Sequence, residues 1–362
     1  MELASADGRV VVQVLPYGLT VHAIRVHHDG DWHDVLAGPE DPADHARYGR
    51  RFFGQVVGRY ANRLPAGTSE AGGVRVDLAE WGGEGVSHHG GPPAVARDGI
   101  EQTGPLDTVT WTVLEHAQLF GDEAHDACAT FGIESPAGDQ GYPGRLRIEA
   151  RIAVDGGDVP SVRVAYRAKL MDACAATPLN LTQHWGFNLD ASSAASKGAG
   201  VGAHVLQMQT PLRRLVLDAR GVPTGELRAV EAEHDWTRGK RIADAMPDGG
   251  YDDFYVWGRP GSGPVVRLAA PSGIALDFST NQAGVQLYTA NSVSDPAPVR
   301  KAVHGGLYDG VRCAAFLEFS APHATFLRPP LHGAAAGDTI LHAGEVYEHW
   351  VNIAIQLNEK GA

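Results

Sequence analysis

Two alternating stretches on either side of a glycine-rich turn limit the fold more than any other feature of this sequence. In residues 146–154 apolar side chains alternate with charged ones, and residues 161–170 repeat the pattern. Successive residues of a strand point to opposite faces of a sheet, so each stretch has one apolar face. The turn Gly156-Gly157-Asp158 lies between them. The two stretches therefore predict an antiparallel pair of strands that packs one face on a core.

Similar strand and turn signals run along the rest of the chain, and helical periodicity is scarce. The other predicted strands are two around the turn Pro16-Tyr17-Gly18, a hairpin over Val265–Phe278, and single strands at Ala314–Phe319 and Glu348–Gln356. Only residues 234–245 could hold one or two helical turns. The 45 glycines and 22 prolines favour many turns. The pattern predicts an all-β antiparallel sandwich or barrel, and because no linker divides it, residues 1–362 are predicted to form a single domain.

Charge and cysteine usage exclude several classes of function. A net charge of −13 argues against nucleic acid or an anionic membrane as the partner. The three cysteines, Cys128, Cys174 and Cys313, are far apart and form no C-x-x-C pair, which argues against a disulfide framework or a zinc site of cysteines. The first residues resemble no secretion signal, and no stretch reaches the ~20 apolar residues that span a bilayer. The expected compartment is the cytoplasm.

Residues Leu179 to Asp190 contain the first candidate for catalysis, His184. If this stretch is a strand, His184 shares a face with Thr182, Gly186 and Asn188. Gly186 would then leave space for a ligand beside the imidazole, and such a histidine is a candidate acid–base group. The alternative is a half-buried histidine with a structural role. The small residues 191–203 that follow are expected to form a surface loop, or a flap over a site.

A second candidate, Glu318, lies in the apolar stretch F-L-E-F-S. A buried, unpaired carboxylate is costly, so a fold keeps one only where it has a partner or a task. Burial would raise its pKa, which suits a general base near neutral pH. The alternative is a glutamate on an exposed strand face.

Three further stretches carry polar groups that are candidates for a binding site. Residues 53–64 contain Arg59, Asn62 and Arg63, whose guanidinium and amide groups are good donors to sugar hydroxyls or carboxylates, although arginines also cover surfaces. In the run 88–91, H-H-G-G, adjacent side chains of an extended chain diverge, so at most one histidine is expected in a site. No H-E-x-x-H accompanies them, and no metal site is predicted. Of the two carboxylates in 251–254, Y-D-D-F, only one can face a pocket.

The order of these motifs resembles that of the aldose 1-epimerases, also called galactose mutarotases. The motifs that carry the resemblance are V-V-G-R-Y-A-N-R (56–63), H-H-G-G (88–91), D-Q-G-Y-P-G-R-L (139–146), A-T-P-L-N-L-T-Q-H-W-G-F-N-L (176–189), P-T-G-E-L (223–227), Y-D-D-F (251–254), Q-L-Y-T-A-N (286–291) and F-L-E-F (316–319). The resemblance implies a large antiparallel β-sandwich of the galactose mutarotase-like supersandwich type. It implies an isomerase that interconverts the α and β anomers of a hexose, with no metal and no cofactor.

The resemblance also implies roles for individual residues. His184 would be the general acid and Glu318 the general base. Sugar-binding roles fall on five further residues: Asn62, Arg63, His89, Asp252 and Gln286. The partner is thus a small-molecule sugar, and the resemblance fixes neither the preferred sugar nor the oligomeric state.

The sequence departs from the family pattern around these motifs. Trp185 and Gly186 follow the histidine, Phe319 and Ser320 follow the glutamate, Pro322-His323 stands where an acidic residue is usual, and residues 92–98 replace the usual segment after H-G-G. A wider or differently floored cleft is one hypothesis. Three alternatives stay open: an enzyme of the same fold acting on another hemiacetal or a sugar phosphate bound by Arg213-Arg214, a carbohydrate-binding sandwich without catalysis, and a glycosidase that pairs Glu318 with Asp252.

Overall fold

The hairpin predicted from the alternating stretches is present in the computed structural model, which describes residues 1–48, 50–93, 103–193, 199–257, 263–292, 301–305, 312–332 and 337–358. Strand β12 (Leu146–Asp155) pairs antiparallel with β13 (Ser161–Leu170), in register from Leu146 opposite Leu170 to Asp155 opposite Ser161. Their apolar residues are buried, as the alternation predicted. The other two predicted strand pairs, at residues 10–26 and 265–278, are also confirmed.

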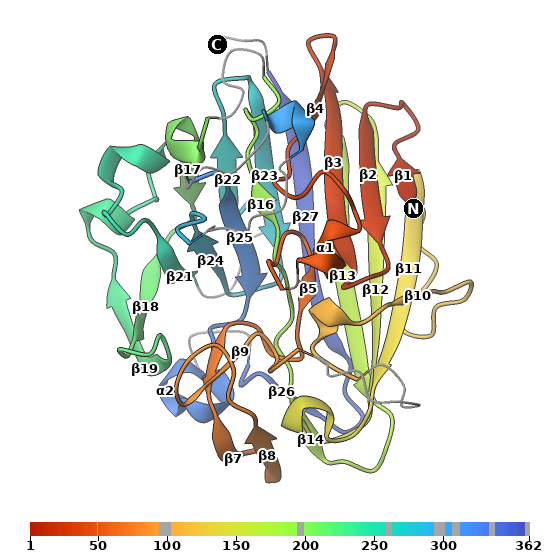
Figure 1. Ribbon diagram of the computed structural model, residues 1–362, viewed down its shortest axis with the longest axis vertical. Coiled ribbons are helices and arrows are strands. Elements are labelled where there is room, and N and C mark those ends of the chain that lie inside the picture. Colours follow the sequence, from red (N-terminus) through yellow and green to blue (C-terminus); the bar gives the residue numbers. More distant parts are fainter. Residues whose placement is uncertain are drawn as a thin grey trace.

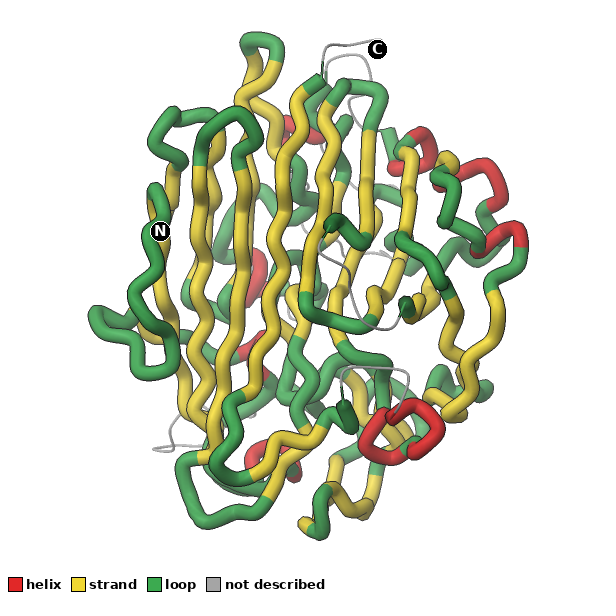
Figure 2. The backbone as a smooth tube through the Cα atoms, turned by 180° about the vertical axis from the view of Figure 1, so that it is seen from behind, coloured by secondary structure: helices red, strands yellow, loops and turns green. Residues whose placement is uncertain are grey.

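These two strands belong to a broad nine-stranded antiparallel sheet, seen from behind in Figure 2. Its strands, in spatial order, are β10 (Thr112–Val113), β11 (Ala127–Ser135), β12, β13, β27 (Tyr347–Leu357), β23 (Ile274–Thr280), β22 (Val266–Ala269), β17 (Val205–Met208) and β20 (Lys240–Arg241).

A second layer lies in front of this sheet and contains two further antiparallel sheets (Figure 1). The six-stranded one is β16 (Gly186–Phe187), β25 (Ala315–Ser320), β24 (Gly284–Tyr288), β21 (Asp252–Val256), β18 (Arg213–Leu217) and β19 (Pro223–Ala229). The four-stranded one is β1 (Glu2–Ala4), β2 (Val10–Leu15), β3 (Thr20–His28) and β4 (Asp31–Asp34).

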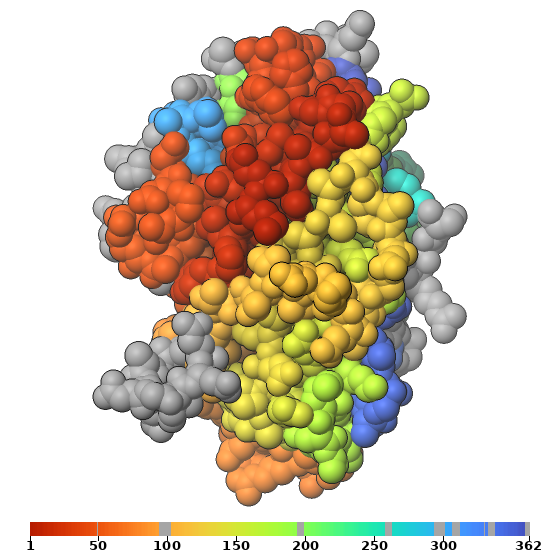
Figure 3. All heavy atoms as spheres, turned by 90° about the vertical axis from the view of Figure 1, so that its right-hand side faces the viewer, coloured from red at the N-terminus to blue at the C-terminus, as the bar shows by residue number. Residues whose placement is uncertain are grey.

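Short strand pairs complete the architecture: β5 (Val56–Val57) with β15 (Thr182–Gln183), β6 (Arg63–Pro65) with β9 (Val86–His88), β7 (Gly67–Ala71) with β8 (Val74–Leu78), and β14 (Ala176–Pro178) with β26 (Ile340–His342). From the side, the N-terminal strands and the segment around β10 and β11 form one continuous surface (Figure 3).

The main apolar core lies between the two layers. It combines Ile152 and Val164 of the nine-stranded sheet with Leu317 of the six-stranded sheet and Val12 of the four-stranded sheet. Burial of one face of each sheet against the other is the arrangement that defines a sandwich. The all-β sandwich prediction is confirmed. Because one core cluster runs from the first strand to the last, we propose that the chain forms a single domain, as the sequence predicts.

Helices are few and short within the described part of the chain. The α-helices are α1 (Asp44–Arg47) and α2 (Pro329–His332), and the 3₁₀ turns are η1 (Leu106–Thr108), η2 (Asp139–Gly141), η3 (Val201–Ala203), η4 (Ala232–His234), η5 (Ile242–Ala245), η6 (Ala302–His304) and η7 (Thr325–Leu327). The predicted helical turns at 234–245 are therefore two 3₁₀ turns with β20 between them. Among the described helices, none is both long enough and apolar enough to cross a membrane.

The stretch from Leu179 to Asp190 is not the single strand that its alternation suggests. Its segment β15 pairs with β5, while β16 pairs with β25 of the six-stranded sheet, and His184 lies between them. Both faces of the stretch are buried, and the Trp185 indole Nε1 donates to the Leu317 carbonyl at 2.8 Å. The His184 backbone is fixed by residues 54 and 55: its N–H donates to the Gln55 carbonyl at 2.8 Å, and its carbonyl accepts from the Gly54 N–H at 2.7 Å.

Candidate active site

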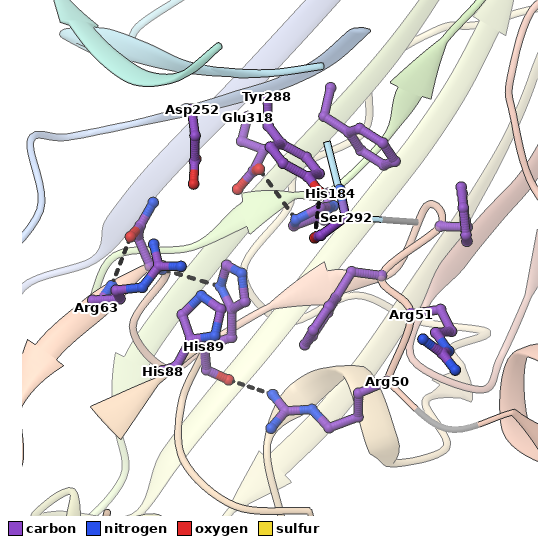
Figure 4. Close-up of a pocket in the computed structure, with 14 residues that line it drawn as sticks. Arg50, Arg51, Arg63, His88, His89, His184, Asp252, Tyr288, Ser292 and Glu318 are labelled. Atoms are coloured by element: carbon purple, nitrogen blue, oxygen red, sulfur yellow. Dashed lines mark hydrogen bonds and ion pairs between the residues drawn. The ribbon is translucent and has the colours of Figure 1, made fainter. Parts of the chain in front are cut away.

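A pocket with a volume of about 280 Å³ opens at the junction of the six-stranded sheet, the His184 segment and the chain around residues 50–63. This is just below the about 300–1,000 Å³ range typical of sites for drug-sized ligands, which suits a single monosaccharide ring. Figure 4 shows the side chains that line it: Arg50, Arg51, Phe52, Phe53, Asn62, Arg63, His88, His89, His184, Asp252, Tyr288, Ser292, Phe316 and Glu318.

The two predicted acid–base residues meet at the centre of this pocket. The distance from His184 Nε2 to Glu318 Oε1 is 3.1 Å, although the residues are far apart in the sequence. Glu318 lies in the middle of β25, where alternation points Phe316 and Glu318 into the pocket and Leu317 and Phe319 into the core. Glu318 is therefore a buried carboxylate with a partner, and the exposed-face alternative is excluded.

Burial shifts the pKa of both groups toward their neutral forms. It lowers the pKa of His184 to about 4. It raises the pKa of Glu318 to about 8, and the negative charge of Asp252 adds to that rise while Arg63 opposes it. Between these limits the pair holds one exchangeable proton.

His89 presents a hydrogen-bond donor to the pocket. Its Nδ1 accepts from the Asn62 backbone N–H at 3.1 Å, and burial together with nearby His88, His184, Arg50 and Arg63 holds its pKa well below the usual value. The ring is therefore neutral, and its proton resides on Nε2.

This tautomer bears on metal binding. One nitrogen each from His89 and His184 and one oxygen of Glu318 lie within 4.8 Å of one another, a set that could hold a cation. Ligation through His89 Nε2 would move its proton to Nδ1, which faces the Asn62 N–H. The donor set therefore does not fit a metal ion, and we assign none.

Asp252 and Gln286 lie on neighbouring strands. Asp252 lines the pocket, whereas Gln286 does not: its Nε2 donates to Asp252 Oδ1 at 2.7 Å, and its Oε1 accepts from Asn62 Nδ2 at 3.3 Å. Asp253 turns away and pairs with Arg214 at 2.8 Å. Only one carboxylate of this motif faces the pocket, as expected. We propose that Gln286 orients Asp252 and Asn62 instead of contacting the sugar directly.

Both histidines of the H-H-G-G motif line the pocket, so the prediction that at most one does is wrong. Their ring centroids are 3.8 Å apart. His89 adopts φ +48°, in the left-handed region, where the alternation of an extended chain no longer applies. His88 thus contributes a second, half-buried imidazole to the wall of the site.

Several lining residues were not found in the sequence. Phe316 stands two residues before Glu318 and Tyr288 two residues after Gln286, so the two-residue period of a strand was a usable signal for both. The segment Arg50–Phe53 precedes the family motif and carries no such signal.

Two arginines that the sequence offered as candidates have structural roles instead. The buried Arg59 donates to the carbonyls of Ser135, Pro136 and Pro143, and Arg214 is held by Asp253 rather than available to a phosphate.

Those departures from the family pattern that lie in the described part of the chain do not line the pocket. Trp185 and Phe319 are buried in the main core, and the buried His323 packs on Phe254 with ring centroids 4.3 Å apart. A Cβ added at Gly186 would lie 2.8 Å from the Phe316 ring, so that space is already filled. The hypothesis that Gly186 widens the cleft is wrong. Residues 94–98, and residues 194–198 within the predicted loop 191–203, lie outside the described part of the chain.

We expect Gly186→Ala to destabilise the protein. The added methyl group would overlap the Phe316 ring and the Ala314 side chain, both of which are buried. Overpacking of this kind typically costs about 1–3 kcal/mol, which urea unfolding would measure. A variant as stable as the wild type would show that the Phe316 ring can move aside.

Comparison with known proteins agrees with this geometry. The family described as Aldose 1-epimerase matches residues 2–354. The aldose 1-epimerase of Haemophilus influenzae is 28% identical over 305 residues, which cover 82% of this chain and 79% of that protein. The galactose mutarotase of Homo sapiens is 31% identical over 289 residues, which cover 77% of this chain and 74% of that protein.

Two solved structures share the fold. The GalM/aldose epimerase homologue of C. elegans superposes with a TM-score of 0.79 at 21% identity and covers 99% of each chain. The galactose 1-epimerase of Lactobacillus acidophilus gives a TM-score of 0.75 at 23% identity, over 99% of this chain and 95% of that chain. Sequence and fold agree along nearly the whole length, and the chain belongs to the aldose 1-epimerase family.

Proposed function

We propose that this protein interconverts the α and β anomers of a free hexose in the cytoplasm. The observation that carries the proposal is the 3.1 Å contact between His184 Nε2 and Glu318 Oε1 inside a pocket the size of one sugar ring. The two oxygens that exchange protons in anomerisation, the C1 hydroxyl and the ring oxygen, are bonded to the same carbon. A base and an acid that contact each other can therefore reach both.

Ring opening requires one proton to leave and another to arrive. Glu318, as carboxylate, takes the proton of the C1 hydroxyl, and His184, as imidazolium, donates a proton to the ring oxygen. The C1–O5 bond breaks, the C1 hydroxyl becomes an aldehyde, and rotation about C1–C2 presents its other face. Each positioned proton transfer typically contributes ~10²–10⁴-fold to the rate.

Ring closure runs the same transfers in reverse. Glu318, now protonated, returns its proton to the aldehyde oxygen, while neutral His184 takes the proton of the C5 hydroxyl as that oxygen attacks C1. The pair holds one proton throughout, either as an ion pair or as two neutral groups. This matches the proton count that burial imposes between the two shifted pKa values.

The remaining polar groups are proposed to hold the other hydroxyls. Arg63 and His89 Nε2 supply donors, and the Asp252 carboxylate, oriented by Gln286, supplies an acceptor. Asn62 contributes to the lining and fixes the His89 tautomer through its N–H. Contacts that stabilise the bound sugar and the transition state equally would not raise the turnover rate, so we expect a modest affinity for the sugar.

Polarimetry on freshly dissolved α-anomers of a hexose panel tests the proposal. We expect the protein to accelerate the approach to anomeric equilibrium for at least one free hexose. Phosphorylated hexoses and aryl glycosides serve as comparison substrates. Acceleration confined to a sugar phosphate, or release of an aglycone without anomerisation of any free sugar, would contradict the proposal.

A further inference from the structure

The H-H-G-G segment that carries His89 has an unusual backbone. His89, Gly90 and Gly91 have φ values of +48°, +83° and +111°, three left-handed residues in a row. A non-glycine residue in this region typically costs about 1–3 kcal/mol and persists only where its surroundings hold it. At Gly90 a Cβ would come within 2.1 Å of the Gly58 carbonyl oxygen, so this position requires glycine. Groups outside the segment must therefore hold this backbone conformation, for example through hydrogen bonds to its carbonyl and amide groups.

Arg50 does so. Its Nη2 donates to the His89 carbonyl at 2.6 Å (Figure 4), and its Nη1 donates to the Gly91 carbonyl at 2.5 Å. The guanidinium is itself fixed by Asp107, to which Nε donates at 2.7 Å and Nη2 at 2.8 Å. The Arg50 and Asp107 side chains are 6% and 2% exposed, so this two-pronged pair is buried. One side chain therefore connects the His89 segment to the turn η1.

The same guanidinium supports a second wall of the pocket. It lies over the Phe52 ring, 5.0 Å from the centroid. Phe52, also left-handed at φ +56°, packs against His89 at 4.7 Å and His184 at 5.3 Å between ring centroids. Arg50, itself part of the pocket lining, thus braces both the donor histidine and the catalytic histidine.

We propose that Arg50 is a positioning residue of this site, which acts through His89 and Phe52. The expected loss of kcat rests on the proposed function, whereas the expected change at His89 rests on the geometry alone. These contacts require arginine, because the flat guanidinium makes four hydrogen bonds in fixed directions and stacks on an aromatic ring. Lysine offers only a single ammonium group.

The test compares Arg50→Ala with a matched control in the wild-type background. Arg147 pairs with the buried Glu149 at 3.1 Å on β12, outside the pocket, so Arg147→Ala also removes an arginine from a buried carboxylate. We expect Arg50→Ala to lower kcat about 10²-fold, the loss typical of a small misplacement of reacting groups, while Arg147→Ala keeps the wild-type kcat. Arg50→Lys should recover only part of the rate.

A second variant and a second measurement distinguish the loss of a positioning role from a variant that fails to fold. The double variant Arg50→Met with Asp107→Asn leaves no unpaired buried charge and should show the same loss of kcat in a folded protein. Ring nitrogen signals in NMR should show that His89 no longer holds a single tautomer. A folded Arg50 variant with a wild-type kcat and an unchanged His89 signal would overturn the proposal. If the wild type is inactive on every sugar, the proposed function is refuted. The NMR signal of His89 in the Arg50 variants would still test whether Arg50 positions that ring.

Discussion

Glu318→Gln lowers kcat by about 10²–10⁴-fold and leaves the protein folded, the range that one positioned proton transfer contributes. Glutamine has the shape of the glutamic acid but can neither accept nor release the proton of the C1 hydroxyl. Because burial raises the pKa of Glu318 to about 8, the carboxyl is largely neutral at pH 7, and the amide introduces no new buried charge. Stability should therefore be equal to or above that of the wild type, while polarimetry records the loss of rate.

His184→Asn should have a loss of the same order. Combining the two substitutions should lose little more than either alone, because acid and base act as one unit. The matched control is Glu149→Gln: Glu149 is fully buried in β12 and accepts the N–H groups of Gln118 and Leu119, so its replacement should cost stability but not kcat. Glu318→Gln with the wild-type rate would remove Glu318 from the mechanism.

The sequence predicted those parts of the fold in which one face of a strand is buried and the other is not. The β12–β13 pair and the β2–β3 pair follow this rule, and their alternation was sufficient. The rule fails for residues 179–190, which pass from one sheet to another and are buried on both faces. Composition cannot distinguish such a segment from a continuous strand, because both are rich in apolar residues.

The centre of the site was predictable for a different reason. A lone carboxylate in an apolar strand requires a partner, and Glu318 has His184 at 3.1 Å. The wall of the site was not predictable, since it depends on backbone conformation. The left-handed φ of His89 brings His88 beside it, and Arg50 finds its carbonyl partners 39 and 41 residues along the chain. Gln286 similarly stands behind Asp252, a contact that only the register of β21 and β24 decides.

The rate should follow a bell-shaped curve against pH, with kcat/KM highest near the middle of the interval between the pKa values of about 4 and about 8. Below the lower limit both His184 and Glu318 are protonated, so the pair lacks a base. Above the upper limit both are deprotonated, so the pair lacks an acid. Outside the interval kcat/KM should fall tenfold per pH unit, since each limb reports one ionisation of the free enzyme.

The same pKa shift makes stability depend on pH, with a sign that tests Glu318 without any sugar. Glu318 in the folded state holds its proton up to about pH 8, whereas in the unfolded chain its pKa has the ordinary glutamate value of 4.5. The stability that Glu318 contributes is therefore complete below that value and is lost as pH rises through about 8. Glu318→Gln should remove this component from urea unfolding measured across pH and should also flatten the alkaline limb of its residual activity. A stability curve that is identical in the wild type and the variant would mean that Glu318 ionises normally, and a base with an ordinary pKa would shift the bell to lower pH.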